Sequence, residues 1–443
     1  MLRAVLRSDI VLLLGLLLLA AAAAAILAQP ACTSLDAREL EYFRTRRLWQ
    51  CAFDALSAAC GVGLLTSDLR ADYTDVGRWV LLGAGFLGAL LYVTSFARAL
   101  ARSQQQAGRS LASNPLMLAL LFCVLQALAL GGLATVDYVR FRTVDVDAVL
   151  LRGVSAFASL GWSDAFESRA NTVAVAVVAG LGALGCLPWM MLIPGLRRHI
   201  NARTTLISVA SYALFLAALA GLICAAETPR GGAYAGSAPV LASKTTPARY
   251  GRALVQSVSA SGAGIATEPL TDRGVSETTK VALAGALLVG GLPVSAAGGI
   301  SWVFTIAALV GVATALGLRR RRGRGGGGRW YTAGLACLLL YGMLIVATAT
   351  GLLLLETWTA SRFQPAHTFA DALLDAASAV CGGNLTSGLT ESITNESLSS
   401  GIRLGENRYI WAMVWMMLAM ICGRVLAVSV LCRLACGDRR QGD

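Results

Sequence analysis

The chain has few charged residues and almost no lysine. Only 14% of its 443 residues are charged, whereas 56% are hydrophobic, and the mean hydropathy is +0.66. A soluble globular protein is about 45–50% apolar and about 25% charged, so this chain has too little polar surface to cover itself in water. The same hydrophobicity excludes an intrinsically disordered chain. The composition therefore predicts an all-α polytopic membrane protein.

Histidine is scarce as well, and cysteine is scattered. His199 and His367 lie far apart, without the spacing of a Cys/His metal site and without a nucleophile–base motif. Most of the 11 cysteines lie inside apolar runs, which argues against an extracellular disulfide scaffold. Cys32 and Cys51, both on the predicted outer side, remain a candidate pair. We therefore expect no enzyme, no cofactor and no resident metal ion.

The net charge of +12 comes almost entirely from arginine, since Lys244 and Lys280 are the only lysines. Many of the arginines gather in short segments between apolar stretches: Arg3 and Arg7; Arg98, Arg102 and Arg109; Arg197, Arg198 and Arg203; Arg319 to Arg322, Arg324 and Arg329; Arg433, Arg439 and Arg440. Acidic residues concentrate in the alternate segments, which is the positive-inside pattern. It predicts a multi-pass protein of the plasma membrane (the cell inner membrane), with both termini cytoplasmic. The predicted partner is the lipid bilayer, not nucleic acid.

Eight apolar stretches are long enough to cross a bilayer, which takes about 20 residues. They cover residues 9–29, 77–99, 115–136, 171–194, 205–226, 280–315, 331–355 and 408–432. The first also resembles a secretory signal, but its apolar run is longer than that of a signal, so we expect a retained helix. The sixth is too long for one helix and contains glycine pairs and a proline, so we expect two half-helices around an irregular segment at 290–300. Irregular backbone at membrane depth is tolerated where it is buried in protein or lines a water-filled cavity.

An internal repeat lies between these spans. Four short, semi-polar stretches each carry a Ser-Ala pair, then small residues reaching Gly or Asn, then a hydrophobic residue; the pairs are Ser57-Ala58, Ser155-Ala156, Ser259-Ala260 and Ser378-Ala379. Each stretch predicts a re-entrant helix that ends in a loop. The chain is thus expected to form four helix–pore loop–helix repeats around a pseudo-fourfold pore, with boundaries at 1–105, 106–200, 201–325 and 326–443.

Four glycine-bearing loops around one axis can replace the hydration shell of a cation with rings of backbone carbonyls. Glycine suits such loops because a β-carbon obstructs the backbone angles and the close approach that they need. The negative ends of the short helices also favour a cation. Helix packing explains an isolated glycine but not a fourfold pattern. The predicted ion-binding residues are Gly61, Val62, Gly63, Ser159, Leu160, Gly161, Gly262, Ala263, Gly264, Gly382, Gly383 and Asn384.

These motifs resemble those of the Trk/Ktr/HKT superfamily of potassium and sodium transporters. The similarity rests on the first loop through Gly63-Leu64, the third through Ala263-Gly264, the glycine-rich segment 290–300 and Gly423-Arg424-Val425. Length and span number look most like the Ktr-type membrane subunit. The resemblance implies a potassium filter, a homodimer and docking of a cytosolic nucleotide-binding regulatory ring, for which the basic segment 319–324 is a candidate. An orientation signal that contacts anionic lipid explains that segment equally. The resemblance also implies a gate made of Gly290, Gly291, Pro293, Gly298, Gly299 and Arg424.

The chain departs from the family pattern at Asn384, where a filter glycine is expected, and at Ser301-Trp302, where a basic residue usually follows the gate glycines. Asn tolerates left-handed backbone angles, so we expect Asn384 to preserve the loop; a shifted register with Gly383 in its place is the alternative. The predicted function is channel-like K⁺ transport. A Na⁺-permeable or weakly selective variant and a non-conducting scaffold or regulatory paralogue remain alternatives.

Further polar residues have two interpretations each. Arg424, in an apolar span, is either a cation barrier below the filter or part of a structural ion pair. Four residues share one position, three before the repeated serine: Asp54, Arg152, Gln256 and Asp375. They form either a polar collar or an Asp–Arg pair behind the filter. Three acids follow the first three loops and form either an outer mouth that concentrates cations or ordinary solvated charge: Asp68, Asp164 and Glu268.

Overall fold

The computed structural model describes most of the chain. The described residues are 2–34, 44–66, 69, 72–103, 115–162, 169–191, 202–228, 245–266, 270, 275–292, 295–315, 327–359, 367–389 and 408–437. Within these ranges the chain is helical, and its β-structure is limited to an isolated bridge between Thr33 and Tyr73. The fold is the all-α architecture that the composition predicts.

The helices follow one another in a repeated order: a long helix, a short buried helix and a second long or divided helix. In the first quarter these are α1 (Leu2–Leu27), α3 (Arg44–Ala59) and α4 (Asp75–Ser103), with the turn η1 (Pro30–Cys32) after α1. The second quarter has α5 (Pro115–Phe141), α6 (Val146–Phe157), α7 (Arg169–Leu184) and the short α8 (Leu187–Met190). The third has α10 (Ala202–Ala226), α11 (Thr246–Ala263), α12 (Glu277–Val289) and α13 (Trp302–Ala315). The fourth has α14 (Gly327–Thr359), α15 (Phe369–Cys381) and α17 (Arg408–Gly437).

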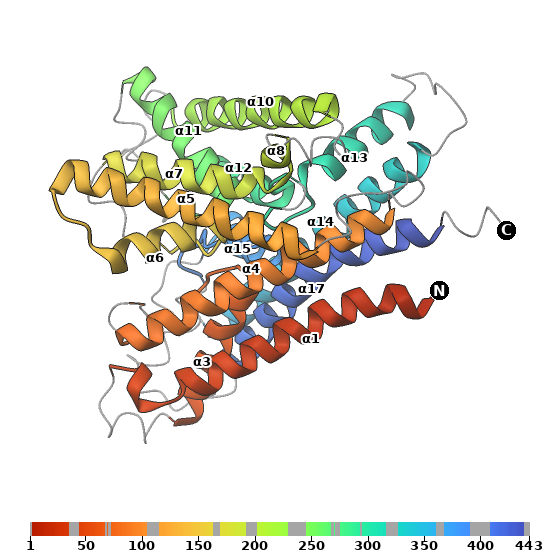
Figure 1. Cartoon of the computed structure of the whole chain (residues 1–443). Helices are drawn as coiled ribbons and strands as arrows, with labels where there is room; N and C mark the ends of the chain where they lie inside the picture. Colours follow the sequence, from red (N-terminus) through yellow and green to blue (C-terminus); the bar gives the residue numbers. More distant parts are fainter. Residues whose placement is uncertain are drawn as a thin grey trace.

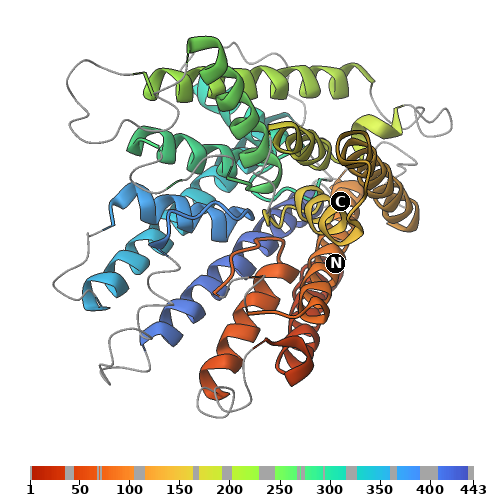
Figure 2. The same cartoon turned by 90° about the vertical axis from the view of Figure 1, so that its left-hand side faces the viewer.

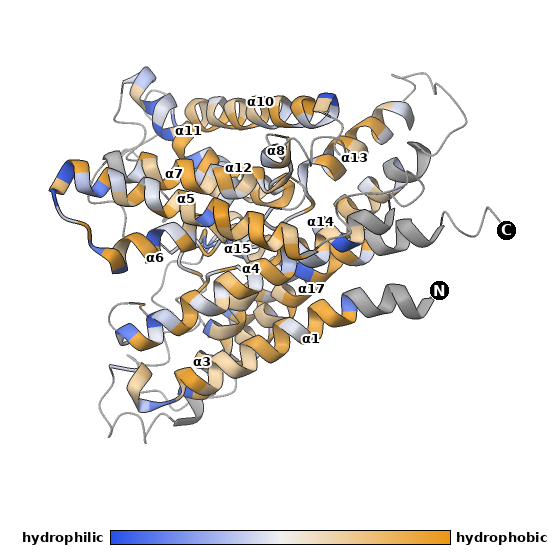
Figure 3. Ribbon diagram, in the orientation of Figure 1, coloured by the Kyte–Doolittle hydropathy of each residue, from blue (hydrophilic) through white to orange (hydrophobic). Residues whose placement is uncertain are grey.

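Among the described residues, six helices are long and apolar enough to cross a membrane. These segments are Asp9–Leu27, Asp75–Ala99, Leu116–Phe141, Ala202–Ala226, Tyr331–Glu356 and Ile410–Val430. Figure 3 shows hydrophobic residues along most of the length of α5 and α10, with hydrophilic residues gathered near their ends. Both the lengths and this distribution are those of bilayer-spanning helices.

The two remaining predicted spans are divided or shortened. The expected helix over 171–194 is wrong at its end: α7 stops at Leu184 because Gly185 takes a left-handed φ of 63° and its N–H bonds to Gly182 at 3.1 Å. The expected division of the sixth span is present, since α12 and α13 flank non-helical backbone. Both α12 and α13 are shorter than the length of about 20 residues that a full membrane crossing takes.

The four quarters are arranged as a ring. The second helix of each quarter packs against the short helix of the next: α4 on α6, α7 on α11, α12 on α15, and α17 back on α3. In Figure 2 the sequence colours run around the molecule, from red at the bottom through yellow at the right and green at the top to blue at the left. This cyclic packing is a pseudo-fourfold arrangement, in which the second and fourth quarters lie opposite each other. The residue boundaries of the repeats stay a prediction.

The two ends of the ring are joined by helices far apart in sequence. Figure 1 shows α1, α4 and α17 side by side, with the start of α1 and the end of α17 at the same end of the molecule. The Ser429 hydroxyl on α17 donates a hydrogen bond of 2.9 Å to the Asp9 carboxylate on α1. The chain therefore closes on itself, and both long terminal helices belong to the core.

Two of the four short helices (α3, α6, α11 and α15) begin at a side-chain cap. The carboxylate of Asp145 caps α6 by accepting from the N–H of Ala148 at 3.1 Å. Thr368 and Asp371 form a reciprocal capping box at the start of α15. Both caps satisfy backbone N–H groups that the first turn of a helix leaves unpaired. The C-terminal ends of the four helices are buried in the ring.

Small residues allow the long helices to touch these ends. A β-carbon at Gly88 of α4 would lie 1.9 Å from the carbonyl oxygen of Ala59, the last residue of α3. The same contact recurs in two other quarters, between Gly182 and Phe157 and between Gly423 and Val380. At these places only glycine leaves room for the neighbouring backbone. The contacts position the loops that follow the short helices.

Candidate functional site

Four segments, called loops here, lie at the ends of the short helices: loop 1 (60–64), loop 2 (158–162), loop 3 (262–265) and loop 4 (382–385). Loops 1, 2 and 4 follow their helices, whereas loop 3 begins with the last two residues of α11, Gly262 and Ala263. Together they contain all the predicted ion-binding residues. Each loop is tied to the repeated serine of its own helix. The backbone carbonyls of Ser57 and Ser155 accept from Val62 and Leu160 at 2.9 Å, and that of Ser259 accepts from Ile265 at 3.2 Å. In loop 4 the hydroxyl of Ser378 donates to the carbonyl of Leu385 at 2.5 Å.

Each loop contributes three of the predicted ion-binding residues, and the third of these differs between loops in its backbone conformation. Gly63, Gly161 and Gly264 take left-handed φ values of 76°, 69° and 64°. Asn384, the fourth member, is not among the described residues with positive φ. The expectation that Asn384 would keep a left-handed angle is therefore wrong. Loop 4 shares the positive φ of its first residue, Gly382 (78°), with Gly61 (60°) and Ser159 (63°). It differs from loops 1 and 2 at its next two residues, where Gly383 has a φ of 157° and Asn384 has no positive φ.

The four loops are in close contact at the centre of the ring. A β-carbon at Gly161 would lie 2.3 Å from Cβ of Asn384, and one at Gly264 would lie 2.2 Å from Cα of Gly383. Both distances are far below normal contact. Because loops 2 and 4 belong to opposite quarters, the approach of Gly161 to Asn384 crosses the centre of the ring. The structure thus brings the predicted filter residues together.

Three hydrogen bonds connect one loop to another. The N–H of Asn384 donates to the carbonyl of Gly264 at 3.1 Å. From loop 2, the Ser159 hydroxyl donates to the Gly262 carbonyl at 2.7 Å, and the Trp162 indole donates to the Gly63 carbonyl at 2.6 Å. Trp162 was not among the residues singled out from the sequence. Nothing in its local pattern indicates a contact with a loop 99 positions away.

Arg424 lies directly beside loop 1. Its side chain, 3% exposed, donates to the carbonyls of Cys60, Gly61 (2.7 Å) and Ala296 (3.2 Å). Its guanidinium carbon is 4.7 Å from the centre of the Tyr92 ring. Within the described part of the chain no ion pair to Arg424 is found, so its partners are carbonyl oxygens and a ring face. The structural ion pair is therefore not found among the described residues, and the cation barrier stays a prediction.

The segment 290–300 packs between several elements. Its ends are hydrogen-bonded to neighbouring backbone: Leu292 N–H to Ala183 at 2.8 Å, Ile300 N–H to Leu288 at 2.9 Å, and Trp302 N–H to Gly291 at 2.9 Å. Three residues near its ends have left-handed φ: Gly290, Gly299 and Ser301. The predicted gate residue Pro293 lies outside the described residues. The segment is irregular and buried, as membrane-depth backbone must be when it is not helical.

The middle of this segment touches the end of α15. A β-carbon at Gly298 would lie 1.6 Å from the carbonyl of Cys381 and 3.2 Å from Nη1 of Arg424. Its other side packs on an aromatic group, in which Tyr212 and Trp302 have ring centroids 5.9 Å apart. The segment therefore joins the end of the fourth short helix to α10 and α13.

The polar residues behind the loops hold their own loops in place. Asp54, fully buried, accepts from the N–H and hydroxyl of Thr66 at 2.8 and 3.0 Å and from the Tyr73 hydroxyl at 2.7 Å. Asp375 does the same for Ser387, at 2.7 and 3.1 Å. In both cases the partner is 12 positions after the aspartate. This spacing, present in the sequence, is a signal by which Thr66 and Ser387 could have been found.

The other two residues at this position act differently. Gln256 donates to the carbonyl of Ile265 at 3.3 Å, which ties loop 3 to its helix. Arg152 forms an ion pair of 2.9 Å with Asp137 on α5. The polar-collar interpretation therefore describes Asp54, Gln256 and Asp375, and the arginine pairs with an aspartate outside the set.

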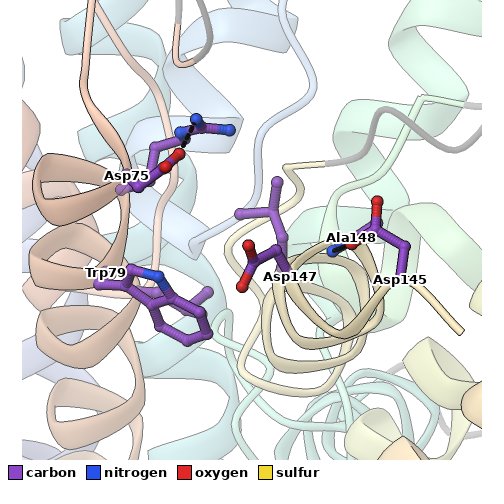
Figure 4. Close-up of a pocket in the computed structure, with 8 residues that line it drawn as sticks. Asp75, Trp79, Asp145, Asp147 and Ala148 are labelled. Carbon is purple, nitrogen blue, oxygen red and sulfur yellow. Dashed lines mark hydrogen bonds and ion pairs between the residues drawn. The ribbon is translucent and has the colours of Figure 1, made fainter.

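A cavity of about 360 Å³ lies between the starts of α4 and α6, on the side that the sequence predicts to be the outer one. Figure 4 shows Asp75 and Trp79 of α4 opposite Asp147 of α6. Asp75 is paired with Arg78, and Asp145 caps its own helix. The acids expected to form an outer mouth, Asp68, Asp164 and Glu268, lie outside the described residues.

The candidate disulfide is not formed. Cys32 and Cys51 are both buried free thiols. Burial raises the pKa of the Cys32 thiol, against the opposing effect of the Arg47 charge. Both facts describe Cys32 as a protonated packing residue.

Comparison with known proteins gives a structural relative. No protein-family model matches the chain, and no curated protein matches it. Among solved structures, it is similar to the crystal structure of the potassium transporter TrkH from Vibrio parahaemolyticus, with a TM-score of 0.60 and 15% identity over 87% of this chain and 77% of that one. At this identity the likeness shows the fold alone. The chain has the fold of a Trk-type helical membrane transporter, and nothing in the likeness singles out the Ktr-type form.

Proposed function

We propose that the protein transports monovalent cations, K⁺ above all, through a channel-like path lined by loops 1 to 4. The observation that carries this proposal is the meeting of four glycine-bearing loops at the centre of the ring, each at the C-terminal end of a buried helix. The structural relative is itself a potassium transporter.

The chemistry of the loops supports a cation. Helix C-termini carry partial negative charge, and four of them lie beside the loops. Backbone carbonyls replace the hydration water of a cation passing through a narrow site. Gly63, Gly161 and Gly264 have left-handed φ values, which are the backbone angles that such a site requires and that a β-carbon would obstruct.

In this proposal the segment 290–300 and Arg424 form the gate. Both lie against the ends of the loops, and the Arg424 side chain contacts loop 1 and Ala296 together. A buried positive charge beside the path opposes the passage of a cation until the side chain moves. The orientation with both termini in the cytoplasm, a homodimer and a cytosolic nucleotide-binding ring docked at 319–324 remain parts of the proposal, and that basic segment lies outside the described residues.

The test is ion flux into vesicles that contain the purified protein. Uptake of K⁺ above that of empty vesicles, exceeding uptake of Na⁺ under the same gradient, supports the proposal. Equal uptake of both ions favours the weakly selective alternative, for which the side chain of Asn384 is the reason. Uptake equal to that of empty vesicles contradicts transport.

A non-conducting scaffold is the second candidate, and one observation favours it. Gly161 and Asn384, from opposite quarters, touch across the centre, and Asn384 N–H uses the carbonyl of Gly264 as its acceptor. In that case the loops serve to hold the ring together. The same vesicle experiment separates the two candidates, because a scaffold shows no flux of either ion.

A further inference from the structure

Loop 2 differs from the other three loops at two positions. The first of the three predicted ion-binding residues is glycine in three loops, Gly61, Gly262 and Gly382, but it is Ser159 in loop 2. The residue that follows these three is aliphatic in three loops, Leu64, Ile265 and Leu385, but it is Trp162 in loop 2. At both positions loop 2 has a side chain that can donate a hydrogen bond, whereas the residues of the other loops cannot donate one from a side chain.

Both of these donors reach into neighbouring loops. The Ser159 hydroxyl bonds to the carbonyl of Gly262 in loop 3 at 2.7 Å, and the Trp162 indole bonds to the carbonyl of Gly63 in loop 1 at 2.6 Å. Both acceptors are predicted ion-binding residues. Ser159 and Trp162 are 0% and 4% exposed, so water does not compete for these bonds.

The backbone at Ser159 indicates that the hydroxyl has a role. Ser159 has a φ of 63°, in the left-handed region that disfavours a side chain. Glycine adopts this angle without a steric penalty, and glycine is what the other loops carry at this position. A strained serine in a buried loop is retained where its side chain makes a contact that glycine cannot make.

We propose that Ser159 and Trp162 are positioning residues that brace the carbonyls of Gly262 and Gly63 and thereby set the preference for the larger ion. The proposal rests on the proposed function. Each carbonyl has two lone pairs, so one accepts the brace while the other remains for a cation. Loop 2 thus connects loop 1 to loop 3 through the carbonyls themselves.

The physical reason for an effect on selectivity is resistance to contraction. The preference among cations depends on the size of the site and on how freely its carbonyls move. Na⁺ is smaller than K⁺ and requires the oxygens to move inward. Carbonyls held by Ser159 and Trp162 cannot move inward in this way, so the braced site favours the larger ion.

The test uses Ser159→Gly, Trp162→Phe and the double variant. The first restores the residue of the other loops and relieves the left-handed strain, and the second keeps the ring but removes the N–H. Trp415→Phe is the matched control, because it removes an indole bond to the Thr348 carbonyl (3.4 Å) between α14 and α17, away from the loops. All four proteins are compared with the wild type at equal abundance in vesicles.

Two readouts are measured. The first is the K⁺/Na⁺ permeability ratio from reversal potentials, which a general loss of folded protein does not shift. The second is hydrogen–deuterium exchange of the amides in 60–64 and 262–265, which does not depend on flux. A hydrogen bond contributes about fivefold to an equilibrium, so we expect each single variant to lower the ratio and raise exchange in its partner loop by about fivefold, with the control unchanged.

The outcomes separate the brace from the proposed function. Unchanged exchange in the double variant overturns the brace, whether or not the wild type conducts. Faster exchange with an unchanged permeability ratio overturns its effect on ion preference. Faster exchange in a protein whose wild type carries no ion supports the brace as a structural link and contradicts the proposed transport function.

Discussion

The guanidinium of Arg424 donates a hydrogen bond of 2.7 Å to the carbonyl oxygen of Gly61, a residue 363 positions earlier in the chain. This bond joins the last long helix to the first loop and closes the ring between the fourth and first quarters. Through Ala296 the same side chain also holds the segment 290–300. One positive charge therefore lies where the proposed filter and the proposed gate meet.

Arg424→Ala is expected to raise the flux of both K⁺ and Na⁺ by about tenfold or more, because repulsion between two unit charges about 8 Å apart at an effective dielectric of about 20 is on the order of 2 kcal/mol. Initial rates of uptake into vesicles measure it. Arg424→Lys is the control: it keeps the charge and should keep flux low. A wild-type rate in Arg424→Ala contradicts the barrier and assigns the side chain a purely structural role.

Asn384→Gly is expected to increase the preference for K⁺ over Na⁺. The substitution removes the side chain that lies beside Gly161 from across the ring, and it gives loop 4 the glycine that the other three loops carry at this position. The K⁺/Na⁺ permeability ratio measures the effect, with the total flux as a separate control for activity. If the preference does not change, Gly383 provides the filter position and the register assigned to loop 4 is wrong.

Asp54→Asn is expected to destabilise the folded protein by about 2 kcal/mol, the usual contribution of hydrogen bonds to a charged group. The amide puts a donor where the carboxylate accepts from Thr66 and Tyr73. Thermal unfolding in detergent measures the loss. Asp145→Asn, at the exposed cap of α6, is the control and should change stability by less. Equal effects at the two positions would show that the buried aspartate is not a brace for loop 1.

Lys280→Met is expected to cost about 3–5 kcal/mol of stability, because it leaves the buried Asp371 carboxylate with its capping bonds to Thr368 but without its cationic partner. Lys280 Nζ lies 2.6 Å from Asp371 Oδ1, with the two side chains 0% and 1% exposed, and this pair ties α12 to the start of α15. In a double variant with Asp371→Asn the loss should be smaller than the sum of the single losses. Strict additivity would mean that the two groups do not interact.

The sequence was sufficient to predict the all-α fold and the close approach of the four loops, whereas the boundaries of the repeats stay a prediction. Small residues after a repeated Ser-Ala pair mark the loops because only such residues allow backbones to meet, and the contact of Gly161 with Asn384 shows how close that meeting is. The pair of glycines before Pro293 likewise marked the interruption between α12 and α13. These features depend on residues that are close together in the chain, so they can be recognised from the sequence alone.

Contacts between distant segments could not be predicted in this way. The bond from Trp162 to Gly63 and the contacts of Arg424 with loop 1 depend on how the quarters are placed around the ring. The backbone angle of Asn384 was predicted wrongly, since positive φ in loop 4 falls on Gly382 and Gly383 and not on Asn384. Such choices are made by packing against other loops, which the local sequence does not contain.

The central claim, that loops 1 to 4 form the ion path, is tested most directly by comparing Gly161→Ala with Gly342→Ala. At Gly161 a β-carbon meets Asn384 at 2.3 Å on a backbone with φ 69°, whereas at Gly342 on α14 it meets nothing within 4 Å. The measurement is K⁺ uptake into vesicles at equal protein abundance. The account predicts loss of nearly all uptake in Gly161→Ala and wild-type uptake in Gly342→Ala; wild-type uptake in both variants would contradict it.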